Sequence, residues 1–433
     1  MRKPTLIFKT TLLIVLIFIL TSSAAKFMGD AECKEPKVHT DMAILVLNPE
    51  EIEAYNKHKE QLEEALKAYF DKAIASGDIV GAGVSIVKGD SIVVSNGFGK
   101  RTVNSAAKVD GETVFRLGSL SKGFTGILAA NLKSEGTLSW QDKVCDFVPG
   151  FKLGDQNNTN KVTLANVLSH STGTPYHCYT DLVESGWQLK DIAKRFSSIK
   201  PISKPGASYS YQNAMFALSS EMMYKATGED MKTSLNKKFF IPLGMSHTFM
   251  DHETVKQAEN IALPHAKSRY GWRALGLKNN YYNALAAGGI SSSPNDMGKW
   301  MRFLLGHNPD VMEQSYFKEA FQPFVDCKEY NKYYQRWPGH VSSHYGFGWR
   351  IHKFVEDEEE KTVWHHGGSV NSYRNEIALY PQADLGICVL LNSNSKLAAT
   401  VIPDLYKIVK DIYNQPNHSM AFNHVEGISA KTE

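Results

Sequence analysis

The stretch FRLGSLSKGF, residues 115–124, places Ser119 three positions ahead of Lys122. The residues TVFRLG before Ser119 are typical of a strand, and the residues from Ser119 onward, SLSKGFTGILAANLKSEG, are typical of a helix. A spacing of three on a helix puts two side chains on one face, within reach of each other. A serine in the first turn also lies near unpaired backbone N–H groups and the positive end of the helix dipole. The stretch therefore predicts a serine and an amine that meet where a strand passes into a helix.

The Ser-x-x-Lys spacing occurs eight times in the chain, so the context of each copy has to separate the candidates. On a strand this spacing puts the two side chains on opposite faces, which excludes Ser85 and Lys88 in the stretch GVSIVKGD. Further copies lie in the N-terminal apolar region, in a polar loop or late in the chain: Ser23, Ser105, Ser315 and Ser393. Ser119 is the candidate that follows a strand and opens a helix.

Outward from this stretch, strands are expected at both ends of the chain and helices between them. A helix is expected over 48–77 and a hairpin over 81–99, and the pattern changes to helices and long loops from about 119 to 285. The later strands are expected over 345–355, 361–368, 374–382 and 385–394, followed by a helix over 397–414. We therefore expect an α/β (α+β) fold: an antiparallel sheet built from N- and C-terminal segments, flanked by helices, with an inserted helical region.

The first 25 residues have the pattern of a signal peptide. Basic residues precede a short apolar run, LLIVLIFIL (12–20), and the small-residue stretch TSSAAK follows it. The run is too short for a comfortable membrane span, although an uncleaved anchor is the alternative. We expect an exported protein, periplasmic or secreted, that meets the membrane only transiently through this peptide. The remaining divisions are a linker and helix start (26–55), the main domain (56–414) and a polar tail (415–433).

Composition excludes several classes of function. The chain has 433 residues, a formal net charge of +3, and 42% hydrophobic and 21% charged residues, as in globular proteins. A nearly neutral chain predicts no nucleic-acid partner, and the acidic run 356–360 is interpreted as a solvated turn between two strands. His340 and His344 lack a nearby carboxylate pattern, so neither a metal site nor a cofactor is expected. The cysteines show no C-x-x-C spacing, and their pairing cannot be read from the sequence: Cys33, Cys145, Cys178, Cys327 and Cys388.

Two further motifs accompany the Ser-x-x-Lys stretch. Tyr211-Gln212-Asn213 precedes a helix, and His365-His366-Gly367-Gly368 ends a strand. In this order the three motifs resemble those of the serine β-lactamase and penicillin-binding-protein superfamily. The closest resemblance is to the class C branch, with its D-aminopeptidase, carboxypeptidase and esterase relatives. It extends over about residues 60–413, and stretches such as LANVLSHSTGTP (164–175) and YGFGWR (345–350) also fit it.

The resemblance implies catalytic roles for three residues. Ser119 would attack an amide, lactam or ester carbonyl and become acylated, while Lys122 and Tyr211 move the protons. Either a Tyr211 phenolate stabilised by the Lys122 ammonium is the base, or neutral Lys122 is the base and Tyr211 a relay. The sequence leaves both assignments open.

The resemblance also implies a substrate-binding set. Asn213 would hold the substrate amide or the head group of Lys122. The backbone N–H groups of Ser119 and Gly368 would form the oxyanion hole. Gly367 and Gly368 would let the substrate approach the strand edge closely.

His365 departs from the class C pattern, which has Lys-Thr-Gly at this place, with a lysine that meets the substrate carboxylate. Imidazole is only partly charged near neutral pH. The chain is therefore more similar to the peptidase, esterase and β-lactamase-related members, and His366 is the alternative inward-facing residue.

The leading hypothesis is an exported serine hydrolase that forms an acyl-enzyme at Ser119 and acts on β-lactams or D-alanyl peptide bonds. A carboxylesterase or D-aminopeptidase using the same site is the alternative. A non-catalytic peptidoglycan-binding scaffold is the third possibility. In each enzymatic case the partner is a small-molecule or peptide substrate.

Overall fold

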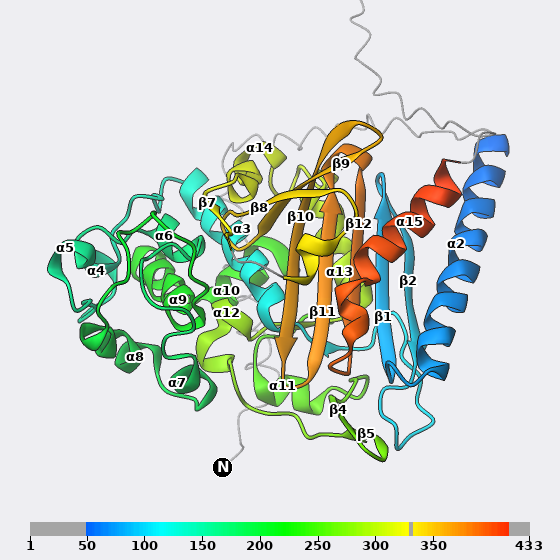
Figure 1. Ribbon diagram of the computed structural model, residues 1–433, viewed down its shortest axis with the longest axis horizontal. Coiled ribbons are helices and arrows are strands. Elements are labelled where there is room, and N and C mark those ends of the chain that lie inside the picture. The colour runs from blue at the N-terminus through cyan, green and yellow to red at the C-terminus, as the bar shows by residue number, and fades with distance from the viewer. Residues whose placement is uncertain (1–48, 329–331, 415–433) are drawn as a thin grey trace, which may run out of the picture. The chain divides into compact units, whose positions relative to one another are not determined.

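An eight-stranded antiparallel sheet forms the centre of the fold (Figure 1). The computed structural model describes residues 49–328 and 332–414. The strand order is β2-β1-β12-β11-β10-β9-β8-β7. The bounds are β1 Gly81–Lys88, β2 Ser91–Gly99, β7 Val325–Asp326, β8 His340–Tyr345, β9 Arg350–Glu356, β10 Glu359–Val370, β11 Tyr373–Tyr380 and β12 Leu385–Leu391.

The two ends of the chain meet in the middle of this sheet. β1 pairs with β12 in antiparallel register, with Val84 opposite Val389. Both strands are apolar runs, GAGVSIVK and LGICVLL, and nearly all their residues are buried. Continuous apolar runs of this kind suit a strand that is covered on both faces.

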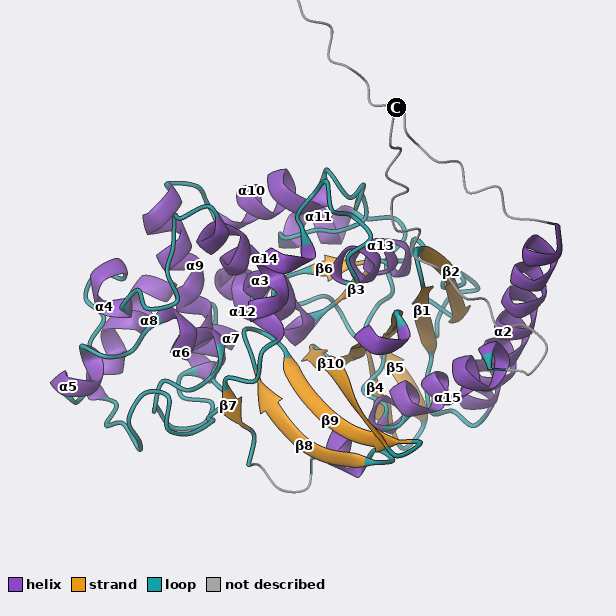
Figure 2. Ribbon diagram, turned by 90° about the horizontal axis from the view of Figure 1, so that it is seen from above, coloured by secondary structure: helices purple, strands orange, loops and turns teal. Residues whose placement is uncertain are grey.

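Helices cover the two faces of the sheet (Figure 2). On one face, α2 (Pro49–Ala75) and α15 (Val401–Tyr413) pack with apolar side chains such as Leu66 and Leu405. On the other face, α3 (Ser121–Ser134) and α13 (Pro294–Leu304) belong to a second apolar cluster. The side chains of the central strands therefore point alternately into two separate cores.

The region between β2 and β7 is mainly helical. Besides α3 and α13 it contains α4 Val144–Phe147, α5 Gln156–Thr159, α6 Leu164–Leu168, α7 Thr180–Glu184, α8 Leu189–Arg195, α9 Asn213–Thr227, α10 Met231–Leu235, α11 His252–Gln257, α12 Leu285–Gly288 and α14 Gln314–Phe317. It also contains two small sheets, β3 (Phe115–Arg116) with β6 (Ser291–Ser292), and β4 (His265–Ser268) with β5 (Gly271–Ala274). β3 lies within TVFRLG (113–118), where the sequence predicts a strand, whereas the other three strands were not predicted.

The expected architecture is confirmed: an antiparallel sheet from both ends of the chain encloses an inserted helical region. The acidic run 356–360 crosses the β9–β10 turn, where Asp357 and Glu358 have φ of +51° and +66°. Two consecutive positive φ values are characteristic of a tight hairpin turn. The expected single strand over 345–355 is wrong, because Gly346–Trp349 form a turn between β8 and β9.

Three of the expected segments lie wholly or partly outside the described residues: the signal peptide (1–25), the linker up to residue 48 and the tail (415–433). The domain limits at 56 and 414 stay predictions. Among the helices of the described ranges, none is both long and apolar enough for a membrane span.

Candidate active site

Ser119 lies in a tight turn between β3 and α3. A single 3₁₀ turn, Gly118–Leu120, precedes the α-helix, and Gly118 has a φ of +57°. A β-carbon at Gly118 would lie 2.9 Å from the backbone carbonyl of Ser369 on β10. Glycine is therefore needed both for the left-handed conformation and for the close approach of the turn to that strand.

The hydroxyl of Ser119 contacts the two residues expected to move protons. The Tyr211 hydroxyl donates a hydrogen bond to Ser119 Oγ at 2.9 Å, and Lys122 Nζ lies 3.3 Å from the same oxygen. Ser119 is half-buried, whereas Lys122 is fully buried in the first turn of α3. The structure thus brings the three predicted side chains together from two distant segments.

The Lys122 amine is surrounded by acceptors. Its Nζ donates to Asn213 Oδ1 at 2.8 Å and to the carbonyl of Ala287 at 2.7 Å. Burial, reinforced by the positive charge of Arg350, holds the pKa of Lys122 well below its ordinary value. The surroundings therefore favour a neutral amine.

Asn213 is part of a hydrogen-bonded chain behind the lysine. While its Oδ1 accepts from Lys122, its Nδ2 donates to the Tyr281 hydroxyl at 3.1 Å. Tyr281 in turn donates to Glu184 Oε1, also at 3.1 Å. Of the two roles expected for Asn213, this geometry favours holding the Lys122 head group.

His170, which the sequence analysis did not single out, supports Tyr211. Its ring packs on the Tyr211 ring with centroids 4.1 Å apart, and its Nδ1 accepts from the backbone N–H of Gln212 at 3.2 Å. His170 is fully buried and comes from the stretch LSHSTG, which had been noted only as part of the family resemblance. The match of this stretch to the family pattern was the sequence feature that could have identified His170.

The assignment of His365 to the site is corrected by the structure. Successive residues of β10 point to opposite faces, and His366 is the one on the side of Tyr211. The His366 and Tyr211 ring centroids are 6.4 Å apart, and the Tyr345 hydroxyl lies 2.8 Å from His366 Nε2. His366 Nδ1 lies 2.8 Å from the Gly367 carbonyl oxygen, which can only accept a hydrogen bond. His366 Nδ1 therefore carries the proton and its Nε2 is the acceptor.

The charge of His366 differs from that of the lysine found in class C enzymes. Burial, with the charge of Arg350, holds the pKa of His366 well below its ordinary value. The imidazole is therefore neutral near pH 7 and does not supply a positive charge to a substrate.

His365 belongs instead to a buried network on the other side of the strand. Its Nε2 lies 2.8 Å from Glu376 Oε2, and its Nδ1 lies 3.1 Å from His352 Nε2. Ser343 Oγ lies between His352 Nδ1 (2.8 Å) and His340 Nε2 (2.7 Å). Burial raises the pKa of Glu376 to about 7, against the lowering effects of Arg374 and the Tyr333 hydroxyl.

This shift predicts a pH-dependent contribution of Glu376 to stability. Because the pKa is raised from 4.5 to about 7 on folding, the contribution is complete below pH 4.5 and is lost as pH rises through about 7. The stability of the wild type relative to Glu376→Gln should therefore fall over this interval and then level off. Urea unfolding of both proteins from pH 4 to pH 8.5 measures the difference, and a constant difference would contradict the assignment.

The structure gives a reason for glycine at positions 367 and 368 other than the expected close approach of the substrate. A β-carbon at Gly367 would lie 2.5 Å from the Tyr333 hydroxyl and 3.0 Å from Glu376 Oε2. A β-carbon at Gly368 would lie 2.1 Å from the carbonyl oxygen of Leu117. The two glycines thus let β10 fit between the buried Glu376 network and the turn that carries Ser119.

Arg350, at the start of β9, is the charged residue that the sequence analysis missed. Its guanidinium carbon lies 5.8 Å from the Tyr211 ring centroid and 5.7 Å from that of Tyr345. Within residues 49–328 and 332–414, no ion pair includes Arg350, and its buried Nε has no hydrogen-bond partner. A half-buried cation without a counter-charge is available for a ligand anion.

In the described part of the chain, no group of three or more His, Cys, Asp or Glu side chains is arranged to hold a metal ion.

Comparisons with known proteins give similarities over most of the chain. The Beta-lactamase family model matches residues 66–407. Unguisins hydrolase ungD of Aspergillus violaceofuscus (strain CBS 115571) is 25% identical over 370 residues, which are 78% of this chain and 63% of that protein. Protein flp of Staphylococcus aureus (strain N315) is 24% identical over 382 residues, 83% of this chain and 70% of that protein. The chain thus spans less than two thirds of the length of the first of these relatives.

A solved structure shares the fold. The octameric penicillin-binding protein homologue from Pyrococcus abyssi superposes with a TM-score of 0.67 at 24% identity, over 79% of this chain and 77% of that one. The family match extends over most of the chain, including the segments that carry Ser119, Lys122 and Tyr211. The chain belongs to the beta-lactamase family of serine hydrolases.

Proposed function

We propose that the chain is a serine hydrolase that forms an acyl-enzyme at Ser119 and acts on β-lactams or D-alanyl peptide bonds. The observation that carries this proposal is the position of Ser119 Oγ, within 2.9 Å of the Tyr211 hydroxyl and 3.3 Å of Lys122 Nζ. A serine hydroxyl needs a neighbouring base to become a nucleophile, and both candidate bases lie at contact distance.

The hydrogen-bond geometry favours Lys122 as the base for acylation. A neutral amine has two N–H groups, which the oxygens of Asn213 and Ala287 accept, and one lone pair. That lone pair is left to accept the proton of Ser119, while the Tyr211 hydroxyl donates to Ser119 Oγ. Tyr211 is then placed to pass a proton to the leaving group.

The oxyanion of the tetrahedral intermediate is assigned to the N–H of Ser119 and the N–H of Ser369, in place of the expected Gly368. In the antiparallel ladder Gly368 is paired with Asn375 of β11, whereas the Ser369 backbone lies against the Ser119 turn, where its nitrogen would be 3.0 Å from a β-carbon at Gly118. Each donor of this kind contributes about 3–4 kcal/mol to transition-state stabilisation in comparable enzymes.

Arg350 favours substrates that carry a carboxylate. His366 is neutral, so the guanidinium of Arg350 is the positive charge available beside Tyr211. β-Lactams and D-alanyl peptides both end in a carboxylate, whereas simple esters need not. A carboxylesterase or D-aminopeptidase activity on the same site is therefore the second candidate, and export through residues 1–25 remains part of the proposal.

Labelling tests the proposed nucleophile directly. The protein is incubated with a fluorescent penicillin and, separately, with a fluorophosphonate, and the adduct is located by mass spectrometry. We expect a label on Ser119 with both probes. A label with the fluorophosphonate alone favours the esterase or aminopeptidase. No label with either probe favours the non-catalytic scaffold and contradicts the proposal.

Replacement of Arg350 by methionine tests the substrate class. A hydrogen bond to a charged group contributes about 1.5–3 kcal/mol, so KM for a carboxylate-bearing substrate should rise by about 10-fold or more. KM for a neutral ester should change little, and Arg350→Lys should retain part of the effect. Because Arg350 lowers the pKa of Lys122, its removal should also shift the acidic limb of the pH profile upward. Equal changes in KM for both substrates would contradict carboxylate recognition.

A further inference from the structure

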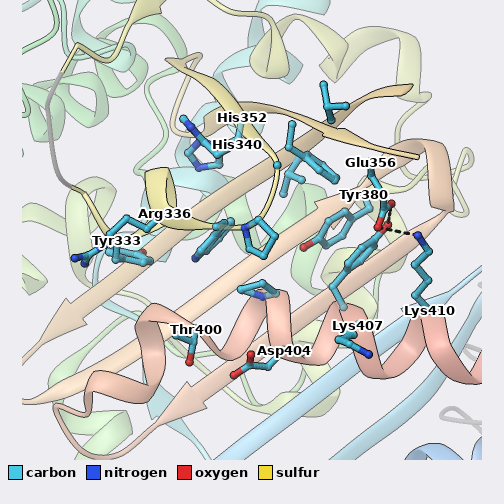
Figure 3. A pocket seen from close by; sticks show the side chains of 18 of the residues that line it. Tyr333, Arg336, His340, His352, Glu356, Tyr380, Thr400, Asp404, Lys407 and Lys410 are labelled. Carbon is cyan, nitrogen blue, oxygen red and sulfur yellow. Dashed lines mark hydrogen bonds and ion pairs between the residues drawn. The ribbon is translucent and has the colours of Figure 1, made fainter. Parts of the chain in front are cut away.

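A cavity lies on the face of the sheet opposite Ser119. It has a volume of about 700 Å³, opens to solvent and is bordered by β9 to β11, α15 and residues 333–340 (Figure 3). Val363 of β10 lines it, whereas the next residue, Trp364, packs in the core on the side of α3. Since neighbouring residues of a strand face opposite ways, the cavity and the Ser119 site are separated by the sheet.

Several aromatic side chains line this cavity. Trp337, Phe354, Tyr380 and Tyr406 line it, and the Tyr380 and Tyr406 rings are stacked with centroids 4.3 Å apart. Its volume and apolar lining are those of sites that bind small organic molecules. Flat rings of this kind favour a ligand with a flat, apolar body.

Three of the polar groups around these walls are already paired. The Tyr406 hydroxyl donates to Glu356 at 2.6 Å, and Lys410 forms an ion pair with the same carboxylate at 2.9 Å. The Trp337 Nε1–H donates to the carbonyl of Ala399 at 2.9 Å. A ligand body therefore does not need to supply hydrogen bonds there.

Arg336 is the exception among the charged residues that line the cavity. Its side chain is exposed, and among residues 49–328 and 332–414 no acidic group forms an ion pair with it. By contrast, Lys407 is paired with Asp411, Lys410 is paired with Glu356, and Asp404 accepts a hydrogen bond from the Tyr69 hydroxyl. The Arg336 guanidinium is therefore the lining group that remains available to pair with an anionic group on a ligand.

We propose that this cavity binds a small organic anion, with a flat apolar body between the aromatic rings and its charged group at Arg336. This site is separate from the proposed hydrolase function, and neither depends on the other.

The probe for this proposal is 1-anilinonaphthalene-8-sulfonate, an aromatic anion that fluoresces in apolar surroundings. We expect a saturable rise in fluorescence with wild-type protein. Arg336→Gln should weaken binding of this probe by about fivefold or more, because a charge-assisted contact is lost. The uncharged N-phenyl-1-naphthylamine should bind both proteins alike. Ala399→Phe, which fills the cavity from the segment before α15, should remove the binding of both probes.

Arg273→Gln is the matched control, since Arg273 is an exposed arginine on β5 outside this cavity. It should leave both affinities unchanged, and thermal unfolding checks that each variant is folded. Unchanged binding in Ala399→Phe, or equal loss of both probes in Arg336→Gln, would overturn the proposal. A crystal structure with the sulfonate bound outside the cavity would overturn it without any variant.

Discussion

Replacement of Ser119 by alanine should lower kcat/KM for any substrate by about 10³-fold or more, as when other hydrolases lose their nucleophile. The reason is that Ser119 Oγ is the oxygen placed between the Tyr211 hydroxyl and the Lys122 amine. Without that oxygen no acyl-enzyme forms, and only binding and the oxyanion donors remain. Steady-state kinetics on a β-lactam and on an ester substrate measure the loss.

Ser315→Ala is the matched control for this change. Ser315 has the same Ser-x-x-Lys spacing, but its side chain is exposed at the start of α14 and donates to Glu313. Its replacement should leave kcat/KM within about twofold of the wild type, as expected for a surface position. Activity that survives in Ser119→Ala would contradict the assignment of the nucleophile.

Replacement of Lys122 by arginine should lower the acylation rate by a comparable factor, about 10³-fold, if Lys122 is the base in a unit that acts together with Ser119. The guanidinium stays protonated at all working pH values and cannot accept the proton of Ser119. Wild-type activity should fall as the pH drops through the lowered pKa of Lys122, because the amine then becomes protonated. Rapid-mixing measurements of acylation between pH 5 and pH 10 give both results.

Tyr211→Phe distinguishes the two bases that the sequence left open. If Lys122 is the base, this variant should retain slow acylation with the acidic limb of the pH profile in place. If a Tyr211 phenolate were the base, that limb would disappear together with the activity. Fluorophosphonate labelling of Ser119 in the same variant checks that the turn is intact.

Local patterns in the sequence were sufficient for most of the elements and for the contact between Ser119 and Lys122, whereas the role of Tyr211 was expected from the family resemblance. The continuous apolar runs at 81–88 and 385–391 predict buried strands, because the preference for a strand depends on residues that are neighbours in the sequence. The spacing of Ser119 and Lys122 predicts their contact for the same reason, since the two residues share one turn.

The tertiary structure decided which side chains complete the site. His365 and His366 are adjacent in β10, and the sequence does not show which of them faces the turn that carries Ser119. That orientation depends on how β10 packs between the two cores. No local pattern distinguishes Arg350 or Tyr281 in the sequence. In the folded protein Arg350 lies near Tyr211, and Tyr281 lies near Asn213, although each pair is far apart in the chain. Contacts of this kind depend on packing between segments, which is why local sequence determined the elements and the fold but only the folded structure identified the surroundings of Ser119.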